Sequence, residues 1–391
     1  SKIFFYFGYA QDGLSEITIG DQPINKTSYL GVLSIILFFV VAVCIIKSKR
    51  KFDGLTKIAN VITVIFILVA LVELIPIADA EKPNIYHIIL DEYTDEEILG
   101  VEFGHDNKEF INFLSNNGFT IPEKSFSTFG STDSELITIL NFEYPNNEIT
   151  KSMKYQLLKN NKVMKKLSDE DYHIIETNSM MRWKDFKEID EKLCYNTGFI
   201  NSEFLEQILS KSIIRYFLEK NQENSRRDTI KCTFDELSNI PLKDFEKPTY
   251  VFSHIYVPHP PFLFGSNGEN VVPNHSVIGG LQSWENPTGY INQLKFANTE
   301  IQKVLSNIIE NDPNAIIILQ GDTGTMTGID TANMGNIKEI YRAHSILFAL
   351  RIPGIQDIEN PFPVNTYRII FNNFFNSKYE YLPEMSFNNL N

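Results

Sequence analysis

The chain has 391 residues, which is enough for one large domain or two ordinary ones with a sizeable core. Its formal net charge of −14 excludes a general nucleic-acid-binding surface, because binding to phosphate backbones needs basic patches. The same charge argues against general adhesion to anionic lipid. The 43% hydrophobic content is ordinary for a folded protein, but the apolar residues are unevenly spread along the chain.

Two apolar runs near the start of the chain predict membrane-spanning helices. Residues 30–46 form an uncharged run, and residues 58–75 carry a single charge, Glu73. A helix needs about 17–25 apolar residues to cross a bilayer, and two buried core helices are the alternative interpretation. The opening residues 2–9 look like the end of an earlier span. We therefore expect residues 1–81 to form a membrane region.

The loop between these two spans predicts their orientation. Residues 47–57 are rich in Lys and Arg, and short basic loops stay on the cytoplasmic side of a membrane. Residues 82–391 are therefore expected to form a domain on the extracytoplasmic face of an integral cell membrane protein. Cys194 and Cys232 could form one disulfide there, although their spacing does not demand it.

Residues 82–391 alternate β-rich runs with helical stretches, which predicts a mostly parallel sheet covered by helices on both faces. The Pro-, Gly-, Asn- and Ser-rich segment 256–288 reads as a long loop, and such loops are often functional. In chain order, strands are expected at 85–90, 173–177, 249–255, 315–319 and 346–352, and helices at 106–117, 134–141, 150–167, 203–219 and 289–311.

Acidic residues follow two of the most apolar predicted strands. Asp91 and Glu92 come after the first strand, and Asp322 follows the strand at 315–319. Ligands of open α/β sheets collect outside the carboxyl ends of parallel strands, so these acids can meet in one pocket. Adjacent residues on an extended chain point to opposite sides, so we expect only one of Asp91 and Glu92 to face it. Two carboxylates in one pocket, one from each strand end, predict a bound cation. The structural alternatives are a solvated acid after the first strand and a plain β-turn at Asp322.

Thr132 is a candidate nucleophile at the start of a predicted helix. Thr132 and Glu135 match the Thr-x-x-Glu capping box, in which the hydroxyl accepts a backbone N–H bond. A hydroxyl at a helix N-terminus also lies in positive potential, which favours its alkoxide and a bound anion. A metal ion on the same oxygen would lower its pKa further. The capping and the chemical interpretations both remain open.

His254 and His259 lie five residues apart around a proline bend. Each could be a metal ligand, a substrate clamp or a general acid, and a purely structural histidine is the alternative for each. The Pro-His-Pro-Pro context favours a functional His259, because the prolines fix the direction of its ring at low entropy cost. His344, just before the last predicted strand, could reach the same rim.

In this order, Asp91, Thr132, His259 and Asp322 resemble the alkaline phosphatase superfamily. The branch they resemble most is that of the membrane-anchored sulfatase-like proteins related to lipoteichoic acid synthases and phosphoethanolamine transferases. The segments PNIYHIILDEY, SFSTFGSTDSELITILNFEY, VFSHIYVPHPPFLF and IIILQGDTG carry the resemblance, which covers nearly the whole chain. It implies a three-layer α/β/α sandwich with one divalent metal ion (Mn, Zn or Mg) at the carboxyl ends of the strands.

The resemblance also implies roles for individual residues. Asp91 and Asp322 would be acidic metal ligands, Thr132 a metal-binding nucleophile that becomes phosphorylated, and His259 a histidine on the substrate side. Water or an acceptor hydroxyl would then take the transferred group. The implied function is hydrolysis or transfer of phosphate or sulfate esters on an envelope glycan or lipid.

The chain departs from this family pattern at Thr323, where relatives usually have a metal-binding histidine. We therefore expect weak metal binding, with His254, His344, Glu92 or Thr323 as a substitute ligand or a substrate contact. A catalytically impaired member that binds a glycan or lipid, or acts as an envelope-assembly scaffold, is the alternative. The formylglycine pattern of sulfatases is absent around Thr132, so oxidised-cysteine chemistry is not expected.

Overall fold

The computed structural model divides the chain into two units, Ser1–Glu81 and Lys82–Asn391. It describes residues 82–145, 149–177, 185–195, 215–273, 284–328, 336–355 and 358–384, together with positions 54 and 63. The spans expected at 30–46 and 58–75 lie outside the described residues, except for position 63. Within the described part, no helix is long and apolar enough to cross a membrane.

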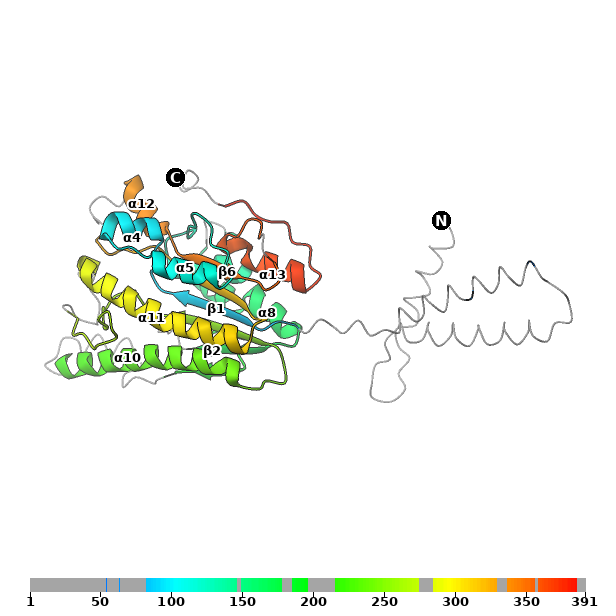
Figure 1. Cartoon of the computed structure of the whole chain (residues 1–391), viewed down its shortest axis with the longest axis horizontal. Coiled ribbons are helices and arrows are strands. Elements are labelled where there is room, and N and C mark those ends of the chain that lie inside the picture. The colour runs from blue at the N-terminus through cyan, green and yellow to red at the C-terminus, as the bar shows by residue number, and fades with distance from the viewer. Residues whose placement is uncertain are drawn as a thin grey trace. The chain divides into compact units, whose positions relative to one another are not determined.

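The described part of the second unit is built on a six-stranded sheet with the strand order β3-β2-β4-β1-β5-β6. Figure 1 labels the strands β1, β2 and β6 of this sheet among the helices that cover it. β1 pairs in parallel with β4 and β5, β2 pairs in parallel with β3 and β4, and β6 runs antiparallel to β5. The predicted, mostly parallel sheet is confirmed. The strands are β1 Ile85–Leu90, β2 His173–Thr177, β3 Glu191–Leu193, β4 Thr249–Ile255, β5 Ile316–Gly321 and β6 Phe348–Arg351.

Both faces of this sheet are apolar and covered by helices. Successive side chains of a strand point to opposite faces, so Ile88 joins one buried cluster and Ile89 the other. Helices α4, α5, α10 and α11 pack on the Ile88 face, and α6, α7, α8 and α13 pack on the Ile89 face. The helices are α4 Glu96–Phe103, α5 Lys108–Asn116, α6 Thr132–Asn141, α7 Lys151–Lys159, α8 Lys162–Asp169, α10 Arg215–Asn239, α11 Pro287–Asn311, α12 Ile337–His344 and α13 Thr366–Phe374.

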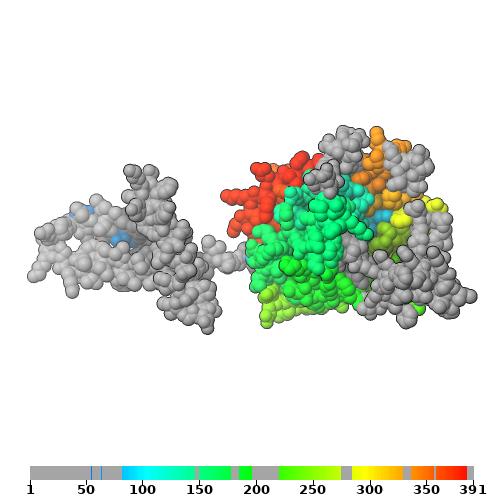
Figure 2. Space-filling model, turned by 180° about the vertical axis from the view of Figure 1, so that it is seen from behind, coloured from blue at the N-terminus to red at the C-terminus, as the bar shows by residue number. Residues whose placement is uncertain are grey.

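The C-terminal segment closes the second of these layers. Figure 2 shows the red C-terminal residues beside the green surface of the α7 and α8 region. The Arg368 side chain donates a hydrogen bond of 3.0 Å to the carbonyl of Phe142, which ties α13 to the end of α6. The sheet is therefore held between helix layers, as a three-layer α/β/α arrangement requires.

Most of the predicted elements agree with the structure, and the expected single helix at 150–167 is wrong. The helix is interrupted at Asn160 and Asn161, which separate α7 from α8. The Asn161 side chain accepts a hydrogen bond from the Met164 N–H and so caps α8. The prediction missed β3, α4, α12 and α13, and residues 203–214 of the helix expected at 203–219 lie outside the described ranges.

Cys194 and Cys232 form a disulfide. The bond joins the segment that follows β3 to the middle of α10, across 38 positions of sequence. The pairing that the sequence left open is thus present in the structure. Disulfides of this kind persist in oxidising compartments.

Candidate metal centre and nucleophile

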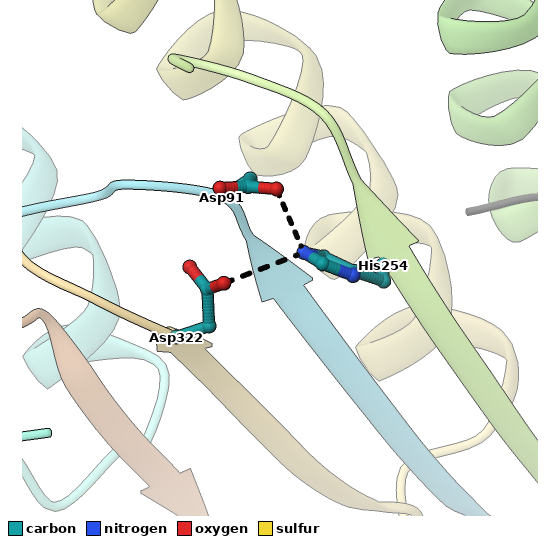
Figure 3. A group of neighbouring side chains, drawn as sticks. All are labelled: Asp91, His254 and Asp322. Atoms are coloured by element: carbon teal, nitrogen blue, oxygen red, sulfur yellow. Dashed lines mark ion pairs between the residues drawn. The ribbon is translucent and has the colours of Figure 1, made fainter. Parts of the chain in front are cut away.

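Three ionisable side chains converge where adjacent parallel strands end (Figure 3). Asp91 follows β1, Asp322 follows β5, and His254 lies near the end of β4. The His254 Nε2 atom is 3.1 Å from Asp91 Oδ2 and 3.8 Å from Asp322 Oδ2. One ligand atom from each residue lies within 4.8 Å of the others, and each side chain is at most 1% exposed. The two acids predicted to meet at the sheet edge do so, with an imidazole beside them.

Backbone groups orient these acids. Asp322 Oδ1 accepts hydrogen bonds from the N–H groups of Glu92, at 3.1 Å, and Thr323, at 2.8 Å. The close approach of β5 to the chain after β1 requires glycine at position 321, because a Cβ atom there would lie 2.3 Å from the carbonyl oxygen of Tyr93. With Oδ1 occupied by two donors, Oδ2 is the oxygen that faces His254.

The electrostatics of this site favour a bound cation. Burial raises the pKa of Asp322, and the negative charge of Asp91 raises it further. Burying two carboxylates is costly unless positive charge is close to them. Two carboxylates and one imidazole are donors that divalent transition metals accept. The residues of the cluster therefore fit the metal ion that the family resemblance implies.

Thr132 is the first residue of α6, and its hydroxyl lies near enough to the Asp322 carboxylate to lower the pKa of that acid. The predicted capping box is wrong, because Ser131 is the N-cap residue and makes no side-chain capping bond. The Glu135 carboxylate instead accepts a 2.6 Å bond from the N–H of Thr128 in the preceding loop. The helix thus begins at Thr132, and the Thr132 hydroxyl lies near Asp322.

Glu92 lies outside this cluster, beside His259. It adopts a left-handed backbone conformation, with φ of 59°, so its side chain leaves the direction of the strand. Its carboxylate accepts a 2.8 Å bond from Trp284 Nε1, and its Oε1 atom is 3.6 Å from His259 Nε2. Burial and the charge of Asp91 hold the pKa of Glu92 well above its usual value. Of the two neighbouring acids, only Asp91 joins the cluster, as expected.

His259 is held by both of its ring nitrogens. Its Nδ1 atom contacts the Pro260 carbonyl and must donate, since a carbonyl only accepts. The Nε2 atom is therefore an acceptor in the neutral ring, and it lies 3.3 Å from the Tyr256 hydroxyl. Burial lowers the pKa of His259 and favours this neutral form. The guanidinium of Arg226 on α10 lies 6.0 Å from the Tyr256 ring centre and brings a positive charge to this side.

His344 and Thr323 take other positions. The His344 Nδ1 atom donates a 2.7 Å bond to the Ser127 carbonyl, and burial lowers its pKa. The histidine thus supports the loop that leads into α6. Thr323 is 7% exposed and contributes its backbone N–H to Asp322. Within the described ranges, the group of potential metal ligands contains neither residue.

Sequence reasoning missed several residues that shape the site. The indole of Trp284 donates to Glu92, and the hydroxyl of Tyr256, just after β4, lies beside His259. The amide of Gln293 on α11 donates to the His259 carbonyl. Trp284 is one of only two tryptophans in the sequence and lies in the segment read as a functional loop, which is the signal that could have identified it. Gln293 has no such signal, because it lies inside a regular helix.

No protein-family model matches the chain, and no curated protein matches it. Among solved structures, it is similar to the C-terminal periplasmic domain of EcEptC from Escherichia coli in complex with Zn. The identity is 12%, over 73% of this chain and 80% of that one, with a TM-score of 0.48. It is also similar to the lipoteichoic acid synthase LtaP from Listeria monocytogenes. There the identity is 15%, over 75% of this chain and 72% of that one, with a TM-score of 0.47.

A third similar structure is described as a 2-O GAG sulfatase, with 14% identity over 73% of this chain and 68% of that one and a TM-score of 0.46. A lipoteichoic acid synthase and a sulfatase are among the kinds of protein that the sequence motifs resemble. The similarity is distant in sequence and partial in structure, so the support for a function comes from the residues of this chain. The chain thus resembles solved sulfatases and a lipoteichoic acid synthase.

Proposed function

We propose that residues 82–391 form a metal-dependent hydrolase or transferase of phosphate or sulfate esters, with Thr132 as the nucleophile. The observation that carries this proposal is the convergence of Asp91, His254 and Asp322 in a buried cluster, with the Thr132 hydroxyl near the Asp322 carboxylate. A divalent cation offsets the buried negative charge, and the N-terminus of α6 adds positive potential at Thr132.

We propose that Asp91, Asp322 and His254 hold the ion, with the Thr132 oxygen beside them. His254 then supplies the imidazole nitrogen that Thr323 cannot, and this donor set suits zinc or manganese better than magnesium. When bound, the ion stabilises negative charge on the ester oxygens and lowers the pKa of a neighbouring hydroxyl.

Side chains of the protein supply the nucleophile and the proton transfers of the proposed reaction. As the Thr132 oxygen attacks the phosphorus or sulfur of the ester, the nearby Asp322 carboxylate takes the proton of the hydroxyl. Attack forms a covalent ester of Thr132 and releases the leaving oxygen, and water or an acceptor hydroxyl then regenerates the threonine. Glu92, whose carboxylate lies 3.6 Å from His259 Nε2, is the group that we propose to return a proton to the leaving oxygen.

The substrate and setting that we propose are an ester on an envelope glycan or lipid, at the outer face of a membrane. The apolar runs at 30–46 and 58–75, the basic loop between them and the Cys194–Cys232 disulfide support this setting. Arg226 supports an anionic substrate, because its charge lies on the His259 side of a site otherwise rich in carboxylates.

The test uses the full chain in detergent, with p-nitrophenyl phosphate and p-nitrophenyl sulfate as probes. We expect manganese- or zinc-dependent release of nitrophenol, loss of at least about 100-fold in Thr132→Ala and partial activity in Thr132→Ser. Mass spectrometry of the quenched reaction should find the added group on the peptide that contains Thr132. Full activity of Thr132→Ala would contradict the proposed nucleophile.

Thr323 favours one other function, a degenerate member of the same family that binds a glycan or lipid without turnover. The variant Thr323→His separates the two functions. If the natural protein neither binds metal nor cleaves either probe while Thr323→His gains both, the natural site is degenerate. If the natural protein does both, His254 is sufficient.

A further inference from the structure

Gln293, on the first turns of α11, is a buried amide with all its hydrogen-bonding capacity directed at one loop. The side chain is fully buried. Its Oε1 atom accepts bonds from the N–H groups of Leu263, at 2.7 Å, and Phe264, at 3.3 Å. Its Nε2 atom donates to the carbonyls of Pro258, at 3.3 Å, and His259, at 2.8 Å. One side chain thus fixes both ends of the turn that carries His259.

The N–H donors of this amide are linked through the backbone of His259 to Asp91, one of the three residues of the cluster. The peptide carbonyl of His259 accepts from Gln293, and the N–H of the same residue donates a 3.1 Å bond to the backbone carbonyl of Asp91. Asp91 in turn donates its N–H to the Ile255 carbonyl at the end of β4. A displacement of residues 258 and 259 would therefore move the imidazole of His259 relative to the end of β1.

The acceptor half of the amide has support from a second residue. Arg227 of α10, which is 6% exposed, donates from Nε to the Leu263 carbonyl at 3.2 Å and from its guanidinium to the Val271 carbonyl. The bridge between Phe264 and Asn270 closes the same turn. Residues 263–271 are thus stabilised by Arg227 and by this bridge as well as by Gln293. The carbonyls of Pro258 and His259, in contrast, receive their side-chain hydrogen bonds from the Gln293 amide.

We propose that Gln293 is the positioning residue of this site, setting the His259 imidazole against the end of β1 through its two N–H donors. This role rests on the proposed function, since it assigns Gln293 a part in the same reaction. Gln293 touches neither substrate nor reacting atoms; it acts through the backbone of His259. The ligand set of Asp91, His254 and Asp322 does not include it.

The variant Gln293→Glu removes only the donor half of the amide. A carboxylate of nearly the same shape keeps the acceptor for Leu263 but faces two carbonyl oxygens that it repels. Asn307→Asp is the matched control on the same helix, because Asn307 Nδ2 donates a 3.3 Å bond to the Ser238 carbonyl far from the site. Asn307→Asp exchanges one amide-to-carbonyl bond for a carboxylate at a half-buried position, and Gln293→Glu exchanges two such bonds at a buried one. The control therefore shows the effect of the same chemical change on the same helix away from the site.

We expect Gln293→Glu to lower kcat toward p-nitrophenyl phosphate by about 10- to 100-fold, the order expected for misplacing a reacting group by about 1 Å, with KM and metal affinity changed less than about 3-fold. Asn307→Asp should keep kcat within about 2-fold. An unchanged kcat in Gln293→Glu, or equal losses in both variants, would overturn the proposal.

A second readout does not depend on turnover. The imidazole NMR signals of His259, assigned by comparison with His259→Gln, should move in Gln293→Glu and stay in place in Asn307→Asp. If the natural protein binds no metal and cleaves no ester, the proposed function fails, and this shift still decides the positioning role. Unmoved His259 signals in Gln293→Glu overturn it.

Discussion

His254 is the residue that turns two strand-end acids into a cluster with both oxygen and nitrogen donors. Its Nε2 atom lies between the oxygens of Asp91 and Asp322, at 3.1 and 3.8 Å. A pair of carboxylates alone would suit magnesium or calcium with several waters, whereas an imidazole nitrogen selects for zinc or manganese. In the proposed site, the identity of the metal would therefore depend on this one histidine.

The first prediction concerns that histidine. Replacing His254 with Ala should lower zinc affinity by at least about 100-fold, because a direct ligand is lost and outer-shell changes alone already cost about 10- to 100-fold. Isothermal calorimetry of the metal-free full chain measures the effect, with Asn307→Asp as the control that leaves the site intact. Equal zinc affinity of His254→Ala and the natural protein would show that this histidine is not a ligand.

Glu135 predicts a pH dependence of stability. Burial raises the pKa of Glu135 to about 8, so the folded protein binds this proton up to a higher pH than the unfolded chain. A raised pKa contributes stability that is full below the unfolded value, near pH 4.5, and is lost as pH rises through about 8.

Between about pH 6 and pH 9 the metal-free protein should therefore lose roughly 2 kcal/mol of unfolding free energy through this group. Urea unfolding at several pH values measures the loss. The variant Glu135→Gln keeps an acceptor for the Thr128 N–H without titrating, so it should flatten the profile and be the more stable protein at the alkaline end. A profile of the same slope in both proteins would rule out Glu135 as its source.

At the scale of elements, the start of α6 depends on the loop before it. Gly130 has a φ of 55°, and a Cβ atom there would lie 2.9 Å from His344 Nε2. His344 in turn donates to the Ser127 carbonyl, so the loop and α12 hold each other. The loop thereby fixes the place at which α6 begins and presents Thr132.

The variant Gly130→Ala should accordingly lose roughly 1–2 kcal/mol of stability, from the left-handed backbone and the displaced imidazole. It should also lower kcat, because Thr132 follows two residues later. Thermal unfolding and p-nitrophenyl phosphate turnover measure the two effects. Gly104→Ala is the control, because Gly104 has a similar φ of 61° with nothing near its added Cβ. A loss of kcat no larger in Gly130→Ala than in Gly104→Ala would contradict the coupling to Thr132.

Apolar strands are the elements that the sequence predicted best. β1, β2 and β4 agree with their expected limits because each is a short β-rich run buried on both faces. The short helices were harder: α4 has Gly100 inside it and starts through the Asp95 side chain, which accepts from the Ile98 N–H. The capping box failed for a related reason, since sequence cannot tell whether Ser131 or Thr132 leaves the helical conformation.

The residues of the candidate site likewise include some that the sequence predicted and some that it did not. Asp91 and Asp322 could be predicted because they lie at strand ends, where topology alone brings residues together. The choice among His254, His259 and His344 could not be made from sequence, since each depends on the direction of a side chain. Gln293 could not be predicted at all, because it meets the His259 loop through the packing of α11 on the sheet. Trp284 carried only a weak signal, its rarity and its place in the long loop.

At the scale of the whole molecule, the disulfide is a long-range tether. It joins Cys194 to Cys232 across 38 positions, and closing a loop of that size in the unfolded chain is worth about 3–4 kcal/mol. The double variant Cys194→Ser/Cys232→Ser should be less stable by that order in urea unfolding. Reduction should destabilise the natural protein and leave the variant unchanged; equal stability of the two oxidised proteins would contradict the tether.

Anomalous diffraction at the zinc edge, from crystals grown with zinc, shows whether Asp91, His254 and Asp322 together bind a metal ion. We predict one strong peak at about 2.0–2.2 Å from His254 Nε2 and from an oxygen of each aspartate, close to the Thr132 hydroxyl. A map with no peak among these three side chains, in crystals that contain zinc, would contradict the account.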